Sequence, residues 1–107
     1  MNPALSDKLL EIRGKFVSSL PEREERLSAL HTKLTAGTCT ATDMDELRFI
    51  VHKIHGLAGT LGFNALGSFA ANLENDVNAA IEKGGYSSAL CDGVTSLIGH
   101  VQDAIKT

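Results

Sequence analysis

Apolar residues recur every three or four positions along nearly the whole chain, and this spacing limits the fold more than any other feature of the sequence. It places apolar side chains on one face of an α-helix, whereas the alternation typical of half-buried strands is scarce. The chain has 107 residues, of which 43% are hydrophobic, so it can enclose one continuous core. We therefore expect an all-α fold in a single domain over residues 1–107.

Proline and glycine divide this pattern into five helical segments. Pro21 ends the first segment and suits the first turn of the second, Gly37 caps the second, Gly62 ends the third, and Gly84-Gly85 end the fourth. The short connections favour antiparallel neighbours. The expected architecture is an antiparallel up-and-down four-helix bundle with an additional N-terminal helix.

The apolar face of each segment gives the expected core. We expect the third helix to start near Asp43, where Asp43 and Glu46 form a pair like a capping box, and Ser87 or Ser88 to cap the fifth. The predicted core residues, in segment order, are Leu5, Leu9, Ile12, Phe16 and Leu20; Leu27, Leu30 and Leu34; Leu47, Val51, Ile54, Ala58 and Leu61; Leu66, Phe69, Ala70, Leu73, Val77 and Ile81; Leu90, Val94, Leu97, Ile98, Val101 and Ile105.

Charge and composition narrow the class of function. A net charge of −3 argues against a nucleic-acid partner, and no apolar run is long enough to span a membrane. The first residues lack the layout of a signal peptide, so we expect a cytoplasmic protein. Cys39 and Cys91 lack metal-ligand spacing and are too few for a disulfide framework. The charged outer faces favour a monomer.

The segment from Val51 to Phe63, VHKIHGLAGTLGF, carries the strongest functional signal. It has helical spacing but contains two histidines and three glycines, and glycine costs about 1 kcal/mol in a helix interior relative to alanine. On a helical wheel, His52 lies about 140° from the core residue Leu47, and the first two glycines lie at about 180° and 120°. The pattern predicts an exposed imidazole with bare backbone beside it.

An exposed imidazole beside glycine suits a phosphoryl group. A neutral imidazole nitrogen is a good nucleophile toward phosphorus, and an unperturbed histidine is mostly neutral at pH 7. Gly56 and Gly59 leave space for the tetrahedral group, while His55 and Arg48, three residues after and four before His52, can donate to its oxygens. His52 is thus the candidate phosphoryl acceptor.

Three alternatives compete with this interpretation. A metal-binding bundle can use His52 and His55, but a structural zinc needs four ligands and no further ligand stands at a suitable spacing on this helix, so no metal is expected. A helical protein-interaction module that transfers nothing is the second alternative. An enzyme ranks last, because no activated nucleophile or second carboxylate stands near His52 and no P-loop is present.

In its helical context the segment resembles the histidine-containing phosphotransfer (HPt) domain of multistep two-component phosphorelays. The family pattern is His, two residues of any kind, Lys or Arg, Gly, and then small residues. At these positions the chain has His52, His55, Gly56, Leu57, Ala58, Gly59 and Gly62. The stretches 15–22 and 73–74 are also similar to the family, so the resemblance covers nearly the whole chain. His55 replaces the usual Lys or Arg, and Leu57 stands where a small or polar residue is usual.

The resemblance implies a phosphocarrier without an ATP-binding module. His52 would shuttle a phosphoryl group between receiver-domain aspartates, and the partners would be receiver domains of response regulators or hybrid histidine kinases. The Mg²⁺ of the transfer would belong to the receiver, so no cofactor is expected on this chain. Glu74 stands where relatives carry a Gln or Glu that hydrogen-bonds the acceptor imidazole.

A docking surface is expected around His52, where the partner must approach. Phe63 has a second interpretation, as an apolar plug at the end of its helix. The candidate contacts are Arg48, Phe49, Lys53, Leu57 and Phe63.

Overall fold

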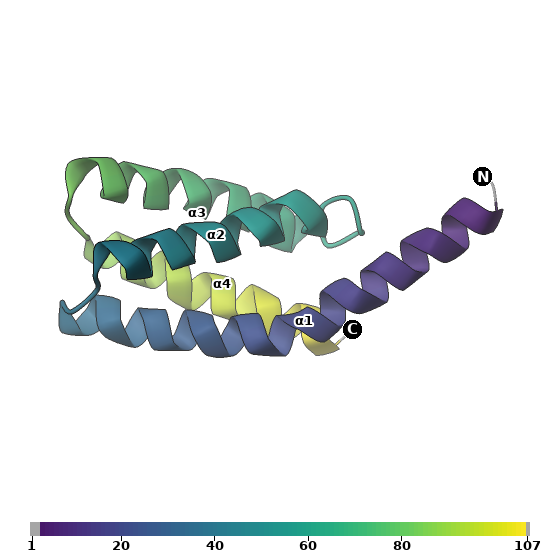
Figure 1. Cartoon of the computed structure of the whole chain (residues 1–107), viewed down its shortest axis with the longest axis horizontal. Coiled ribbons are helices and arrows are strands. Elements are labelled where there is room, and N and C mark those ends of the chain that lie inside the picture. Colours follow the sequence, from purple (N-terminus) through teal and green to yellow (C-terminus); the bar gives the residue numbers. More distant parts are fainter. Residues whose placement is uncertain (1–2, 107) are drawn as a thin grey trace.

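A computed structural model of the chain describes the backbone of residues 3–106 and the side chains of residues 6–106. This part contains four helices and no strand: α1 (Pro3–Ala36), α2 (Ala41–Ala58), α3 (Asn64–Lys83) and α4 (Ser88–Lys106). Each helix packs on two neighbours, in the closed order α1, α2, α3, α4 (Figure 1). The prediction of an all-α up-and-down bundle is confirmed. None of these helices is both long enough and apolar enough to cross a membrane.

The additional N-terminal helix is not a separate element, which corrects the expectation from Pro21. α1 is a single helix of 34 residues with Pro21 inside it. Proline removes one backbone hydrogen bond and crowds the preceding turn, which kinks a helix but need not end it. Leu20 and Leu27, on either side of Pro21, are fully buried, so core packing keeps the helix continuous at Pro21. Figure 1 shows α1 bending where it leaves the bundle.

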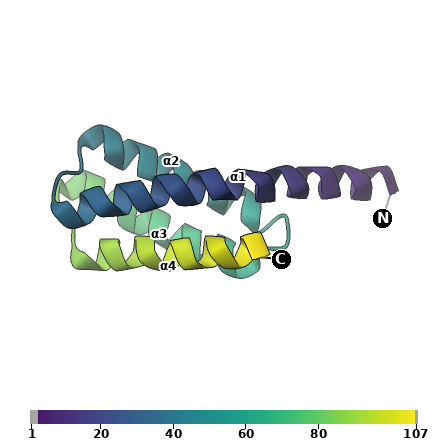
Figure 2. The ribbon, with the colours of Figure 1, turned by 90° about the horizontal axis from the view of Figure 1, so that it is seen from below.

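The N-terminal part of α1 projects beyond the other three helices (Figures 1 and 2). Leu10 is 66% exposed and Ile12 is 37% exposed, so the prediction that Ile12 is a core residue is wrong. No other helix of the described chain reaches far enough to cover these side chains. The core begins at Phe16, and the side chain of Leu5 lies outside the described residues.

Within the bundle the predicted apolar faces form the core. Met44 and Ile50 are also buried, although the sequence pattern did not single them out. The predicted residues that are fully or almost fully buried are Phe16, Leu20, Leu27, Leu30, Leu34, Leu47, Val51, Ile54, Ala58, Leu61, Leu66, Ala70, Leu73, Val77, Leu90, Val94, Leu97 and Val101.

The start of α2 differs from the expected one. Thr40 is the N-cap: its hydroxyl accepts from the Asp43 N–H at 3.1 Å, and the Asp43 carboxylate accepts from the Thr40 N–H at 2.9 Å. The capping box is therefore Thr40 with Asp43, and not Asp43 with Glu46. Glu46 instead pairs with Arg26 of α1 at 2.6 Å, which ties the two helices together.

The other helix ends follow the predicted signals with one shift. Gly37 and Gly84 adopt φ values of 73° and 67°, the left-handed conformation that ends a helix, and the Ser87 hydroxyl accepts from the Leu90 N–H at 3.3 Å. α2 ends at Ala58 rather than at Gly62. Gly62, with φ of 93°, closes the turn that leads into α3.

α3 comes very close to the backbone at the end of α2, where Gly67 faces Gly59. A Cβ placed on Gly67 would lie 2.9 Å from the Gly59 backbone nitrogen, closer than real Cβ atoms come. The helices are antiparallel, and seven residues separate His52 from Gly59 just as seven separate Gly67 from Glu74. Two helical turns, a rise of about 10 Å, therefore lead from the glycine contact to the level of both His52 and Glu74.

Replacing Gly67 with alanine should loosen this contact. Overpacking of this kind typically costs about 1–3 kcal/mol of unfolding free energy, because the helices must move apart to admit the methyl group. Gly99 of α4 is the matched control, since a Cβ there meets nothing within 4 Å. Gly99→Ala should stabilise by up to about 1 kcal/mol. Urea unfolding followed by circular dichroism measures both; equal stabilities of the two variants would contradict the close approach.

Candidate functional site

His52 and His55 lie side by side on the outer face of α2, each one position after a fully buried residue. Val51 and Ile54 fix the rotation of the helix in the core. The side chain of His52 is 64% exposed and that of His55 is 47% exposed. Their rings are roughly perpendicular, with centroids 6.4 Å apart. The predicted acceptor is thus open to another molecule.

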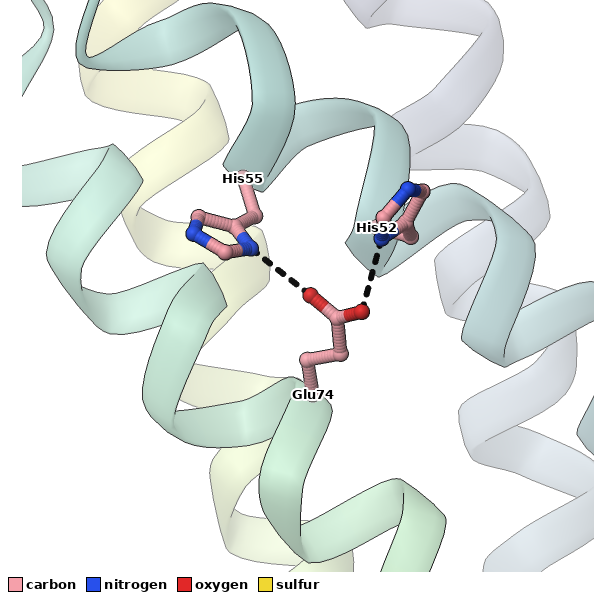
Figure 3. A group of neighbouring side chains, drawn as sticks. All are labelled: His52, His55 and Glu74. Carbon is pink, nitrogen blue, oxygen red and sulfur yellow. Dashed lines mark hydrogen bonds and ion pairs between the residues drawn. The ribbon is translucent and has the colours of Figure 1, made fainter.

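Glu74 of α3 joins the two rings. Its neighbours Leu73 and Val77 are buried and hold this part of α3, so the Glu74 carboxylate is directed toward α2. One carboxylate oxygen lies 2.7 Å from Nδ1 of His52 and the other lies 2.7 Å from Nδ1 of His55. Figure 3 shows the carboxylate between the two rings, with the second nitrogen of each ring pointing away from it.

The carboxylate of Glu74 is in its ionised form at neutral pH. Its partial burial works to raise the pKa, but the hydrogen bonds and charges of His52 and His55 outweigh this effect, and the pKa of Glu74 is lowered from its usual value. An ionised carboxylate can only accept hydrogen bonds. Both rings must therefore donate from Nδ1.

This requirement selects the tautomer of both rings. A neutral imidazole carries one proton, so a proton on Nδ1 leaves a free lone pair on Nε2. For His52 that lone pair faces solvent (Figure 3). His55 already donates its Nδ1 proton to Glu74 in a hydrogen bond. It can therefore donate to a phosphoryl oxygen only when its Nε2 is protonated as well. Glu74 thus does more than hold one ring, because the hydrogen bond that it accepts from Nδ1 of His52 leaves the lone pair of that ring on the outer nitrogen.

Gly56 lies one turn after His52 and leaves open space there, whereas Gly59 lies two turns after His52, at the contact with Gly67. A Cβ placed on Gly56 or Gly59 would meet nothing within 4 Å, so no part of the chain fills the volume that their missing side chains vacate. Arg48 lines the same open depression as His52 and Glu74, and it pairs with Asp45 at 3.4 Å. Its guanidinium stands one turn before the acceptor, as the sequence spacing predicts.

Three of the other predicted docking residues lie on the exposed surface of α2. Phe49 is 58% exposed and Leu57 is 36% exposed, and the ammonium of Lys53 lies 5.6 Å from the centre of the Phe49 ring. Exposed apolar side chains beside a reactive group suit a transient partner surface.

Phe63 lies differently from the other docking candidates. Its half-buried ring packs against Phe16 at a centroid distance of 5.7 Å, and the Arg13 guanidinium covers it at 4.5 Å. This placement corresponds to the plug at the end of α2.

The remaining histidines have local structural contacts. His31 is half-buried and its Nε2 lies 2.9 Å from the Thr95 hydroxyl, while the ring of His100 packs on Phe69 at 4.9 Å. Sequence reasoning assigned Glu74 to one imidazole and missed that it serves two. The available signal was the spacing of His52 and His55, which places both on one helix face within reach of one carboxylate.

Comparison with known families agrees with this geometry. The sequence profile of the Hpt domain matches residues 11–105, nearly the whole chain. The chain therefore belongs to the Hpt domain family, whose members are histidine phosphocarriers that act with receiver domains and histidine kinases in two-component phosphorelays. No curated protein and no solved structure gives a significant match.

Removing Glu74 should allow His52 to adopt both neutral tautomers. In the wild-type protein at mildly alkaline pH, ¹⁵N spectra of the imidazoles should show a proton on Nδ1 and none on Nε2 of His52. In Glu74→Ala the proton should distribute over both nitrogens, because no acceptor holds it. Glu82→Ala, a change at an exposed glutamate of the same helix, should leave the spectrum unchanged. A wild-type ring protonated mainly on Nε2 would disprove the assignment.

Proposed function

We propose that the chain is a phosphocarrier of the cytoplasm in which Nε2 of His52 takes a phosphoryl group from the aspartyl phosphate of one receiver domain and passes it to the aspartate of another. The observation that carries this proposal is the exposed His52 ring whose Nδ1 is held by Glu74, in a chain of the Hpt domain family. The fold supplies the position of the ring and an open face, and the receiver supplies the phosphoryl group with its Mg²⁺.

The transfer step follows from the tautomer. The Nε2 lone pair of His52 forms a bond to phosphorus as the bond from phosphorus to the aspartyl oxygen breaks, and the receiver carboxylate leaves with the bonding electrons. The imidazole gains positive charge in this step because it retains its Nδ1 proton. The Glu74 carboxylate, 2.7 Å from that nitrogen, stabilises the developing charge. The return step is the same exchange in reverse, onto a second receiver.

The surface around His52 supports docking of a receiver. Phe49 and Leu57 offer apolar contact, while Arg48 and Lys53 bring positive charge to an approach that must accommodate a phosphorylated acidic partner. Gly56, one turn after His52, keeps the space beside the ring free of a side chain. We propose that this face of α2, in a monomeric single domain, forms the transient interface.

Replacing His52 with glutamine should abolish phosphoryl acceptance. Glutamine has no nucleophilic nitrogen, and since the site is exposed, the free energy of unfolding should change by less than about 0.5 kcal/mol. The measurement is incubation with a receiver domain phosphorylated on aspartate, followed by detection of label that is stable in alkali and lost in acid, as phosphohistidine is.

His31→Gln is the matched control for this change, because glutamine can still bond to Thr95 there. It should accept as the wild type does. Label that persists in His52→Gln would show that another residue is the phosphoryl acceptor. A wild-type chain that accepts no label from any of a panel of receivers would favour a non-transferring interaction module.

A bulky side chain at Gly56 should block transfer without disturbing the fold. Gly56→Leu fills space that is open in the structure, so stability should stay within about 1 kcal/mol of the wild type, while the receiver can no longer bring its phosphoryl group to His52. Gly14→Leu is the matched control, since Gly14 is equally open but lies in α1, before the first buried residue, Phe16. Transfer rates from a phosphorylated receiver decide the matter: an unchanged rate in Gly56→Leu would refute the steric role of the glycine.

A further inference from the structure

Three side chains of metal-ligand type meet at the site, from two different helices. One ring nitrogen of His52, one of His55 and a carboxylate oxygen of Glu74 all lie within 4.8 Å of one another, and Nδ1 is the nitrogen that faces Glu74 in each ring. In the part of the chain with described side chains, this is the one group of three or more His, Cys, Asp or Glu residues that comes so close together. The two histidines alone offered only half of a zinc ligand set; the packing of α3 on α2 supplies a third ligand.

We propose that His52, His55 and Glu74 form a binding site for a divalent ion of the zinc class, and that this ion blocks phosphoryl acceptance by His52. The first half of this inference concerns binding alone. The second half rests on the proposed function of His52.

The distances are compatible with coordination after small side-chain rotations. Zinc binds imidazole nitrogen and carboxylate oxygen at about 2.0–2.2 Å, so neighbouring ligand atoms in a tetrahedron lie roughly 3.3 Å apart. The two nitrogen–oxygen distances of 2.7 Å must widen, and the histidine nitrogens must draw together from a separation of at most 4.8 Å. Both rings are exposed and can rotate about their side-chain bonds, while Glu74 is 17% exposed and stays anchored between buried neighbours.

The chemistry of the ligands selects the kind of ion. Two imidazoles and one carboxylate suit zinc and related first-row ions, whereas Mg²⁺ and Ca²⁺ require oxygen ligands. Three protein ligands leave the fourth position to water, as in open zinc sites. The Mg²⁺ of a receiver domain would therefore not compete for this site.

Metal binding and phosphoryl acceptance exclude each other at His52 because they need opposite tautomers. An ion on Nδ1 takes the lone pair of that nitrogen, so the single proton of the neutral ring must move to Nε2. Nε2 then carries a hydrogen and has no lone pair for phosphorus. No proton is gained or lost by the ring in this exchange. A bound ion also breaks the hydrogen bond through which Glu74 would stabilise the charge of the transfer step.

Binding is tested by calorimetric titration of the untagged chain with ZnCl₂. We expect one Zn²⁺ per chain in the wild type, and affinity at least about tenfold weaker in His55→Gln and in Glu74→Gln, each of which removes a ligand. His31→Gln should bind as the wild type does, and MgCl₂ should give no binding. An absence of zinc binding, or equal affinity in the wild type and both ligand variants, would overturn the site.

Blocking is tested with phosphoramidate as the phosphoryl donor. This small molecule needs no receiver, so Zn²⁺ cannot act through a receiver's Mg²⁺ site: the Nε2–P bond of His52 forms as the donor's N–P bond breaks and ammonia leaves with a solvent proton. Formation of phosphohistidine is followed by ³¹P NMR, with equimolar Zn²⁺ or with a chelator. We expect zinc to slow acceptance at least about tenfold in the wild type and to have no such effect in His55→Gln, each protein compared with itself, since only the wild type holds the complete ligand set.

The two halves fail in different ways. Equal slowing of the wild type and His55→Gln would place the effect on the donor and overturn the block, as would tight zinc binding without slowing. A wild type that forms no phosphohistidine even with chelator would overturn the proposed function and the block together, while the titration would still decide the metal site.

Discussion

The close packing of α2 on α3 is the constraint on which the site depends. Gly67 allows α3 to approach the backbone of Gly59 at the end of α2, and the buried residues Leu73 and Val51 set the rotation of each helix about its axis. With position along the axis and rotation both fixed, Glu74 lies opposite His52. The His52 ring can remain exposed and still be oriented, because its orientation comes from the Glu74 carboxylate, whose neighbours on α3 are buried in the core. This is how a side chain can be well oriented and yet open to a partner.

Exposure and orientation usually oppose each other in a small helical bundle. An exposed side chain on a helix samples several rotamers, and ordering it costs conformational entropy. Here Glu74 is mostly buried, so its side chain has few rotamers available. Its two oxygens then order both rings. Gly56 has the opposite effect, since the absence of a side chain leaves open space one turn after His52. At this site Nδ1 of His52 is held by Glu74, while the space next to Gly56 is free of side chains.

Periodicity predicted the bundle well because burial in a helical bundle is set mainly by the apolar face of each helix. It failed at Pro21, where local stereochemistry favours a break but the buried leucines on both sides keep α1 continuous. It also failed at Ile12, whose spacing is regular although it precedes the first buried residue, Phe16, and is 37% exposed. Spacing along α2 identified His52, His55 and the glycines. This spacing could not predict the second hydrogen bond of Glu74, to His55. Contacts between helices depend on their axial register, which the spacing within one helix does not encode.

One carboxylate that serves two rings makes those rings dependent on each other. When His52 gains a phosphoryl group or any other charge, the oxygen that faces it is polarised, and the oxygen that faces His55 changes with it. The imidazole of His55 is therefore a natural reporter. Its resonances can reveal the state of the neighbouring His52 ring, because both rings contact the same carboxylate.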